Sequence, residues 1–93
     1  MAGGARRALE RFGQAAAIYE TNQEESNAAT TYMNMAVVYS TQKDYDKSLE
    51  YHRKALAIRE RVHGPRHPST ADSHHNMGTV LREQGDHAAA LEA

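Results

Sequence analysis

Residues 28–63, AATTYMNMAVVYSTQKDYDKSLEYHRKALAIRERVH, hold two apolar-striped segments separated by the polar break Thr41-Gln42-Lys43-Asp44. The first segment carries Tyr32, Met35, Ala36 and Tyr39 at steps of three and four residues, and the second carries Tyr45, Leu49, His52 and Leu56. Residues with this spacing share one face of an α-helix. The stretch therefore predicts two amphipathic helices joined by a short turn.

Parts of this stretch recur on both sides of it. Residues 34–51 align with 76–93 at a shift of 42 and share seven of eighteen positions, and residues 48–60 align with 8–20 at a shift of 40. A period of this length that contains two helices is typical of α-solenoids, in which each repeat buries its apolar face against its neighbours. We therefore expect an all-α solenoid of antiparallel helix hairpins with about 2.2 repeats.

The repeat divides the chain into four parts. Residues 1–4 are expected to form a flexible lead, 5–25 the second helix of a partial repeat, 26–64 a complete repeat, and 65–93 the first helix and a truncated second helix of the next repeat. Gly85-Asp86 is the expected turn inside the last part, because glycine and aspartate favour turns.

The long interval between Gly13 and Gly64 contains neither glycine nor proline. Nothing in its backbone chemistry forces a turn at residues 21–26 or 41–44. A continuous helix through either break, with domain swapping between two copies, therefore stays an open alternative.

The first expected helix of each of two successive repeats carries the same pattern of a bulky, an apolar, a small and a bulky residue. In one repeat these residues are Tyr32, Met35, Ala36 and Tyr39, and in the next they are His74, Met77, Gly78 and Leu81. With small Ser48 and Ala55 on the second helix, it resembles the tetratricopeptide repeat over about residues 8–93. The period near 42 and the linker from Gly64 to Pro68 are similar to the kinesin-light-chain-like branch of that family. His52, His74 and His87 depart from its aromatic preference.

The resemblance implies a right-handed superhelix and assigns packing roles to one set of residues. These are Tyr32, Met35, Ala36, Tyr39, Leu49, Ala55, Met77, Gly78 and Leu81.

Composition excludes several classes of partner. The formal net charge is -1, from 11 basic and 12 acidic residues spread along the chain, which gives no electrostatic footprint for nucleic acid or an anionic membrane. No apolar run exceeds five residues, which is too short for a membrane span. The absence of cysteine suits a reducing compartment. We expect a cytoplasmic protein whose partners are proteins or peptides.

Catalytic and metal sites are not expected. The chain has no cysteine, no Gly-rich phosphate loop and no Ser–His pair that sequence can place. Among its six histidines, His63 and His67 flank a Gly-Pro turn, and His74 and His75 point about 100° apart on a helix, so zinc ligands do not converge. We therefore predict a protein that is not an enzyme and holds no cofactor.

The resemblance places a binding surface on the concave side, which the first helices line. The residues expected there are Asn34, Asn76, Met33, Val37, Thr41, His75, Thr79 and Arg82. An Asn amide offers a donor and an acceptor, so Asn34 and Asn76 are expected to hold a peptide backbone. A clamp for a carboxylate would want a cation beside each Asn, and only Arg82 is available. Arg59 and Arg61 lie near the expected end of their helix, where the dipole favours cations.

The predicted function is a non-catalytic scaffold that binds a peptide or a partner helix on this concave face. The alternative is a structural unit that assembles with itself, by end-to-end stacking or domain swapping. About 2.2 repeats fall short of the three that a solenoid usually needs. Apolar side chains at both ends are expected to be exposed, Phe12 and Tyr19 at one end and Leu81 and Leu91 at the other, which favours a homo-oligomer.

Overall fold

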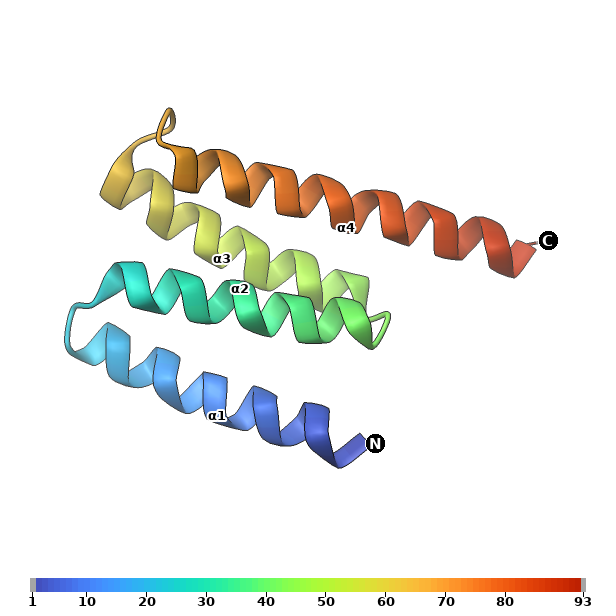
Figure 1. Cartoon of the computed structure of the whole chain (residues 1–93), viewed down its shortest axis with the longest axis horizontal. Helices are drawn as coiled ribbons and strands as arrows, with labels where there is room; N and C mark the ends of the chain where they lie inside the picture. Colours follow the sequence, from blue (N-terminus) through green and yellow to red (C-terminus); the bar gives the residue numbers. More distant parts are fainter. Residues whose placement is uncertain (1, 93) are drawn as a thin grey trace.

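A computed structural model describes residues 2–92 as four α-helices joined by short connections. They are α1 (Ala2–Thr21), α2 (Glu25–Thr41), α3 (Tyr45–His63) and α4 (Pro68–Glu92). Each helix runs antiparallel to the one before it, and the four lie side by side in chain order (Figure 1). The Cα positions extend over 47 × 34 × 14 Å. The predicted all-α array of helix hairpins is confirmed.

A buried hydrogen bond secures a close approach of α2 and α3. Ala36 of α2 and Ser48 of α3 are fully buried, and the Ser48 hydroxyl donates a hydrogen bond of 2.8 Å to the Ala36 carbonyl. Small side chains let two helix backbones come together, and the carbonyl oxygen has a second lone pair to accept the extra bond. Met35, Leu49 and Ala55 are buried as well.

A small apolar core joins α1 to this hairpin. It consists of Ala28, Ala29, Ala55 and Ile58, with Tyr19, Tyr32 and Met33 packed against it. The Tyr51 ring stacks on Tyr39 and Tyr32, with centroids 5.4 and 5.9 Å apart. Because alanine buries little area, most of the hydrophobic stabilisation comes from these few large side chains.

Both tight turns close without glycine. Gln23 and Lys43 have positive φ values of 61° and 65°. The Lys43 amide donates to the Ser40 carbonyl and the Asp44 amide to the Tyr39 carbonyl, both at 2.9 Å, which is the Schellman arrangement. An equivalent pair of bonds closes the turn at Gln23. The chain therefore turns at both breaks, and the continuous helix considered from the sequence is not formed.

The turn predicted at Gly85-Asp86 is wrong for this structure, because α4 continues through both residues. A continued helix keeps its backbone hydrogen bonds through the helix-favouring run Ala88–Ala90. It also lets His87 pack against Tyr45, with ring centroids 5.7 Å apart. The C-terminal turns of α4 extend beyond the other helices (Figure 1).

The straight α4 leaves apolar groups uncovered. Gly78 and Leu81 were predicted to pack as Ala36 and Tyr39 do, but both are exposed, because no described segment folds back over them. Leu91 is 74% exposed, as expected. The end of the array at α4 therefore presents an open apolar face.

Two expectations at the other end are also wrong. Residues 2–4 form the first turn of α1 and not a flexible lead, since a helix extends at little cost once it is nucleated; Met1 lies outside the described residues. Phe12 and Tyr19 are half-buried, and Tyr19 packs against the core, whereas Ile18 is 59% exposed. The exposed large side chain of α1 is thus one position away from the predicted one.

Positions 43 and 85 are equivalent in the repeat but hold opposite backbone conformations. Lys43→Gly should raise the free energy of unfolding by about 1 kcal/mol, because glycine takes a positive φ without the steric cost that lysine bears. Gly85→Lys should stabilise the end of α4 by about the same amount, because lysine favours a helix over glycine. Denaturant unfolding followed by circular dichroism measures the first effect, and amide hydrogen exchange along α4 measures the second.

Gln42→Gly is the matched control for the turn, because Gln42 has a φ of -81° that suits any residue. It should give no gain in stability. Faster exchange in α4 of Gly85→Lys would contradict the straight helix and would indicate a left-handed turn at residue 85.

Candidate functional site

A groove of about 400 Å³ lies between α2 and α4, with α3 beneath it. Its lining residues are Met33, Val37, Ser40 and Thr41 of α2, His52 of α3, and Asn76, Thr79, Val80 and Glu83 of α4. α2 and α4 are the first helices of successive repeats, so equivalent positions contribute in pairs: Val37 with Thr79, and Thr41 with Glu83. The groove combines apolar walls with a few polar groups, which is the usual composition of a ligand site.

Five of the eight residues predicted for the binding surface line this groove. They are Met33, Val37, Thr41, Asn76 and Thr79. Asn34, His75 and Arg82 are exposed but do not line it. The reason is geometric, because a helix has two edges and only one faces a given neighbour. The edges that α2 and α4 turn to the groove overlap only in part: Met33 and Ser40 line it from α2, whereas Asn76 and Val80 line it from α4, so Asn76 lines the groove and the equivalent Asn34 does not.

The eight predicted residues leave out Ser40, His52, Val80 and Glu83, which also line the groove. Ser40 lies three residues after Val37, and a helical projection could have found it. His52 was assigned to packing, and its burial agrees with that role. Its place beneath the groove depends on α3 lying between α2 and α4, which no periodicity in one helix can show.

His52 brings an unsatisfied polar atom to the floor of the groove. The residue is 2% exposed, and its Nδ1 atom has no hydrogen-bond partner. Burial lowers the pKa of His52 below the ordinary value of 6.5, and the nearby Arg59 cation lowers it further. The imidazole is therefore neutral at physiological pH.

Two nitrogen donors converge on the sulfur of Met33. The Asn76 Nδ2 atom lies 3.2 Å from it, and the Arg59 Nη2 atom lies 3.7 Å from it. Arg59 is held in place by its Nη1 atom, which donates to the Ser69 carbonyl at 3.3 Å and to the Ser73 hydroxyl at 2.9 Å. A thioether is a weak acceptor, so both donors are poorly satisfied.

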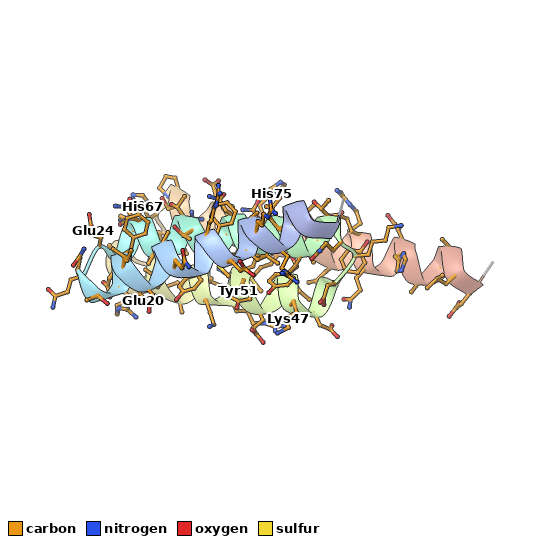
Figure 2. All side chains as sticks on the ribbon, turned by 90° about the horizontal axis from the view of Figure 1, so that it is seen from below. Glu20, Glu24, Lys47, Tyr51, His67 and His75 are labelled. Carbon is orange, nitrogen blue, oxygen red and sulfur yellow. The ribbon has the colours of Figure 1, made fainter. Side chains whose placement is uncertain are left out.

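A larger cavity of about 560 Å³ lies among α1, α2 and α3, where Tyr32 and Lys54 are among its lining residues. The Lys54 ammonium lies over the ring of Tyr51. Figure 2 shows that Tyr51 and Lys47, also of α3, lie on the opposite side of the molecule from His75 of α4. The Tyr32 hydroxyl donates to Glu20, and burial together with that bond raises the pKa of Tyr32 to about 12.

The polar walls of this larger cavity are already engaged. Arg61 pairs with Glu25, and the Lys54 ammonium lies over the Tyr32 and Tyr51 rings at 5.4 and 5.1 Å. These contacts leave fewer unsatisfied groups for a ligand than the smaller groove has. We therefore take the groove between α2 and α4 as the candidate site.

The described residues also bear on metal binding and on membrane insertion. No group of three or more potential metal-ligating side chains occurs within residues 2–92. His63 and His67 stack with ring centroids 4.3 Å apart, and the His67 Nδ1 atom accepts from the Ser69 amide at 3.0 Å. These contacts assign His67 to the linker. None of the four helices is long and apolar enough to cross a membrane.

A layer of antiparallel helix hairpins with a groove between successive first helices defines a helical-repeat protein. The family model for the tetratricopeptide repeat matches residues 27–93, and the chain belongs to this family. Its repeats generally mediate interactions between proteins and are not catalytic modules.

One curated relative is the Clustered mitochondria protein homolog of Danio rerio, which is 36% identical over 59 residues. The aligned region covers 63% of this chain and 4% of the relative, so the chain spans a small part of that protein's length. No solved structure matches the chain.

Burial of neutral His52 makes stability depend on pH. In the unfolded state His52 binds a proton near the ordinary pKa of 6.5, whereas in the folded state it binds one only at lower pH. Its contribution to the free energy of unfolding is therefore fully present above pH 6.5 and is lost as the pH falls through the folded-state pKa. His52→Phe removes this titration. Urea unfolding at about pH 8 and about pH 5 should show a smaller loss for His52→Phe than for the parent chain.

The matched control is His75→Gln, because His75 is exposed on α4. This variant should lose as much stability on acidification as the parent chain does. An equal loss in all three proteins would contradict the buried, neutral state of His52.

Proposed function

We propose that this chain is a non-catalytic scaffold that binds a peptide segment of a partner protein in the groove between α2 and α4. The observation that carries the proposal is a groove with a mostly apolar surface in which two polar groups, on His52 and Asn76, lack good partners inside the protein. His52 Nδ1 has none, and the Asn76 amide reaches only a thioether sulfur. Unmet hydrogen-bonding groups cost free energy when buried, and a ligand that pairs with them recovers it.

The groove suits an extended peptide better than a bulky folded surface. Its walls are two helices, and its lining spans two turns of each, from Met33 to Thr41 and from Asn76 to Glu83. Asn76 can donate to a peptide carbonyl and accept from a peptide amide, as an Asn side chain offers both groups. Asn34, His75 and Arg82 lie outside this groove and are proposed to act only in contacts that extend beyond it.

Finer assignments belong to the same proposal. The shift of 42 between repeats and the Gly64–Pro68 linker favour the kinesin-light-chain-like branch of the family. The nearly balanced charge favours a protein partner over nucleic acid or an anionic membrane, and the absence of cysteine suits a cytoplasmic location. The division into a partial repeat at 5–25, a complete repeat at 26–64 and the start of the next repeat from residue 65 stays a proposal, in which α4 is one continuous helix.

Self-assembly is a second candidate, favoured by the open face of α4. Leu81 and Leu91 are 53% and 74% exposed, and Ile18 is exposed at the other end of the array. Exposed apolar side chains at both ends favour association of copies end to end. Such a homo-oligomer would use surfaces that the groove does not include.

Selection from a phage-displayed library of random heptapeptides tests the groove. Selected peptides should bind Val37→Glu about tenfold or more weakly than the parent chain, because the new carboxylate lies in the groove wall. Ile18→Glu is the matched control, since Ile18 and Val37 are similarly exposed at 59% and 54%. It should retain peptide binding.

Equal losses in both variants, or no peptide selected above background, would contradict the proposal. Sedimentation of the same proteins separates the second candidate. Self-assembly through α4 predicts a molar mass that falls toward the monomer in Leu91→Glu and stays unchanged in Val37→Glu, whereas a monomeric parent chain contradicts it.

A further inference from the structure

We infer that Glu83 forms a subsite for a basic side chain, arginine above all, in the groove between α2 and α4. The inference rests on the proposed function and names the ligand more closely: a peptide segment in which one arginine lies among apolar residues. Three features of the groove carry it. They are the carboxylate of Glu83, the neutral hydrogen-bond acceptors that share the groove with it, and the apolar walls.

Glu83 is a half-buried carboxylate that lines the groove from α4. Three ion pairs form within residues 2–92, and none of them includes Glu83. A carboxylate that is partly removed from water costs free energy unless a cation compensates for the lost hydration. A ligand that brings such a cation into the groove therefore gains affinity from it.

Arg59 does not neutralise Glu83, because it approaches the groove at a different level. Its Nη2 atom lies 3.7 Å from the Met33 sulfur. Met33 precedes Thr41, the repeat equivalent of Glu83, by eight residues, which is about 12 Å along α2. Among the described residues that line the groove, none is a Lys or an Arg. The lining therefore carries a negative charge without a positive one.

Neutral acceptors line the same groove. The hydroxyls of Thr79 and Thr41 each donate to the carbonyl four residues earlier in their own helix, at 3.1 and 3.0 Å, so their oxygen atoms keep lone pairs for a ligand. Thr79 lies about one helical turn before Glu83. On the floor, His52 Nδ1 lacks a partner and accepts when the imidazole proton is on Nε2. A guanidinium has five N–H donors and no acceptor, so it complements these groups.

The apolar walls suit the stem of a basic side chain. Val37 and Val80 line the groove from α2 and α4. Long basic side chains cover apolar surface with their methylene groups while the charged head reaches a polar partner. A guanidinium can contact a carboxylate through two parallel N–H bonds and still offer other donors to neighbouring oxygens, whereas an ammonium is a single point charge. Arginine therefore fits the groove better than lysine does.

Titration by NMR with capped tripeptides tests the inference. The probes are Ac-Leu-Arg-Leu-NH2 and Ac-Leu-Cit-Leu-NH2, in which citrulline keeps the shape of arginine without its charge, added to the full chain at low salt. The arginine probe should bind about tenfold more tightly and should shift the signals of Glu83, Thr79 and Thr41. Its advantage should shrink at high salt, because ions screen a partly exposed pair. Ac-Leu-Lys-Leu-NH2 should bind more weakly than the arginine probe.

Glu83→Gln is the most specific variant, because it removes the charge at nearly the same shape. The preference for arginine over citrulline should disappear, while the citrulline probe should bind as it does to the parent chain. Glu50→Gln is the matched control, since it makes the same replacement at an exposed carboxylate of α3 outside the groove. It should keep the tenfold preference. Thermal unfolding followed by circular dichroism shows that both variants are folded.

The outcomes separate the two levels of the proposal. Equal affinity for the arginine and citrulline probes, with shifts in the groove, contradicts the cation subsite but leaves peptide binding in place. A preference that survives in Glu83→Gln contradicts the role of Glu83, and lysine that binds as tightly as arginine contradicts the choice of arginine. Shifts confined to other surfaces contradict the subsite and the proposed groove together, as does the absence of shifts with every probe.

Discussion

The close approach of α2 and α3 at Ala36 and Ser48 is the constraint on which the rest of the molecule depends. The Ser48 hydroxyl donates directly to the Ala36 carbonyl, and both side chains are fully buried. No larger residue could lie between the two backbones without moving them apart. This contact fixes the separation of the hairpin helices, and the Schellman turn at Lys43 fixes the direction in which the chain returns.

Because the hairpin is fixed, α3 packs against other helices on two sides. Ser48, Tyr51 and Ala55 are directed to α2 and the core, whereas His52 lines the groove and Arg59 donates to Ser73 of α4. Residues seven apart recur on the same side of a helix, so His52 and Arg59 are brought to one surface at successive levels. The polar groups beneath the groove therefore follow from the way in which α3 is packed.

Some polar groups of the groove lack good hydrogen-bond partners inside the protein. His52 has an orphan nitrogen, and the Met33 sulfur is the shared acceptor of two better donors. Burying such groups works against folding, so they are costly unless a ligand uses them. The larger cavity among α1, α2 and α3 differs, since Arg61 pairs with Glu25 and Glu20 accepts a hydrogen bond from the Tyr32 hydroxyl. Differences in hydrogen-bond satisfaction, and not in volume, therefore distinguish the two cavities.

Much of the fold could be predicted from the sequence, because periodicity reports on single helices. α3 begins directly after the predicted polar break that ends at Asp44, and it ends at the predicted linker from Gly64 to Pro68, where α4 begins. The turns at Gln23 and Lys43 carry no glycine or proline signal, because residues other than glycine take the left-handed conformation there. Gly85 gave a misleading signal, since contacts made by the straight helix outweigh the preference of glycine for a turn.

The site was harder to predict, because it depends on which edge of a helix faces which neighbour. Asn76 and Asn34 look equivalent in the repeat, yet only Asn76 lines the groove. Arg59 looks like a cation that complements the end of its helix, and its approach to Met33 depends on contacts 26 residues apart in the chain. Such contacts follow from the packing of three helices and have no counterpart in local spacing.

The most direct test of this account is the free energy of unfolding of Ala36→Leu beside that of Gly78→Leu, measured by urea denaturation. The two positions are equivalent in the repeat, but Ala36 is fully buried against α3 and Gly78 has open space around it. The account predicts that Ala36→Leu loses about 2 kcal/mol through overpacking, while Gly78→Leu loses nothing and gains helix propensity. Equal losses at both positions would show that α4 packs as α2 does, and no loss at Ala36 would contradict the close approach of α2 and α3.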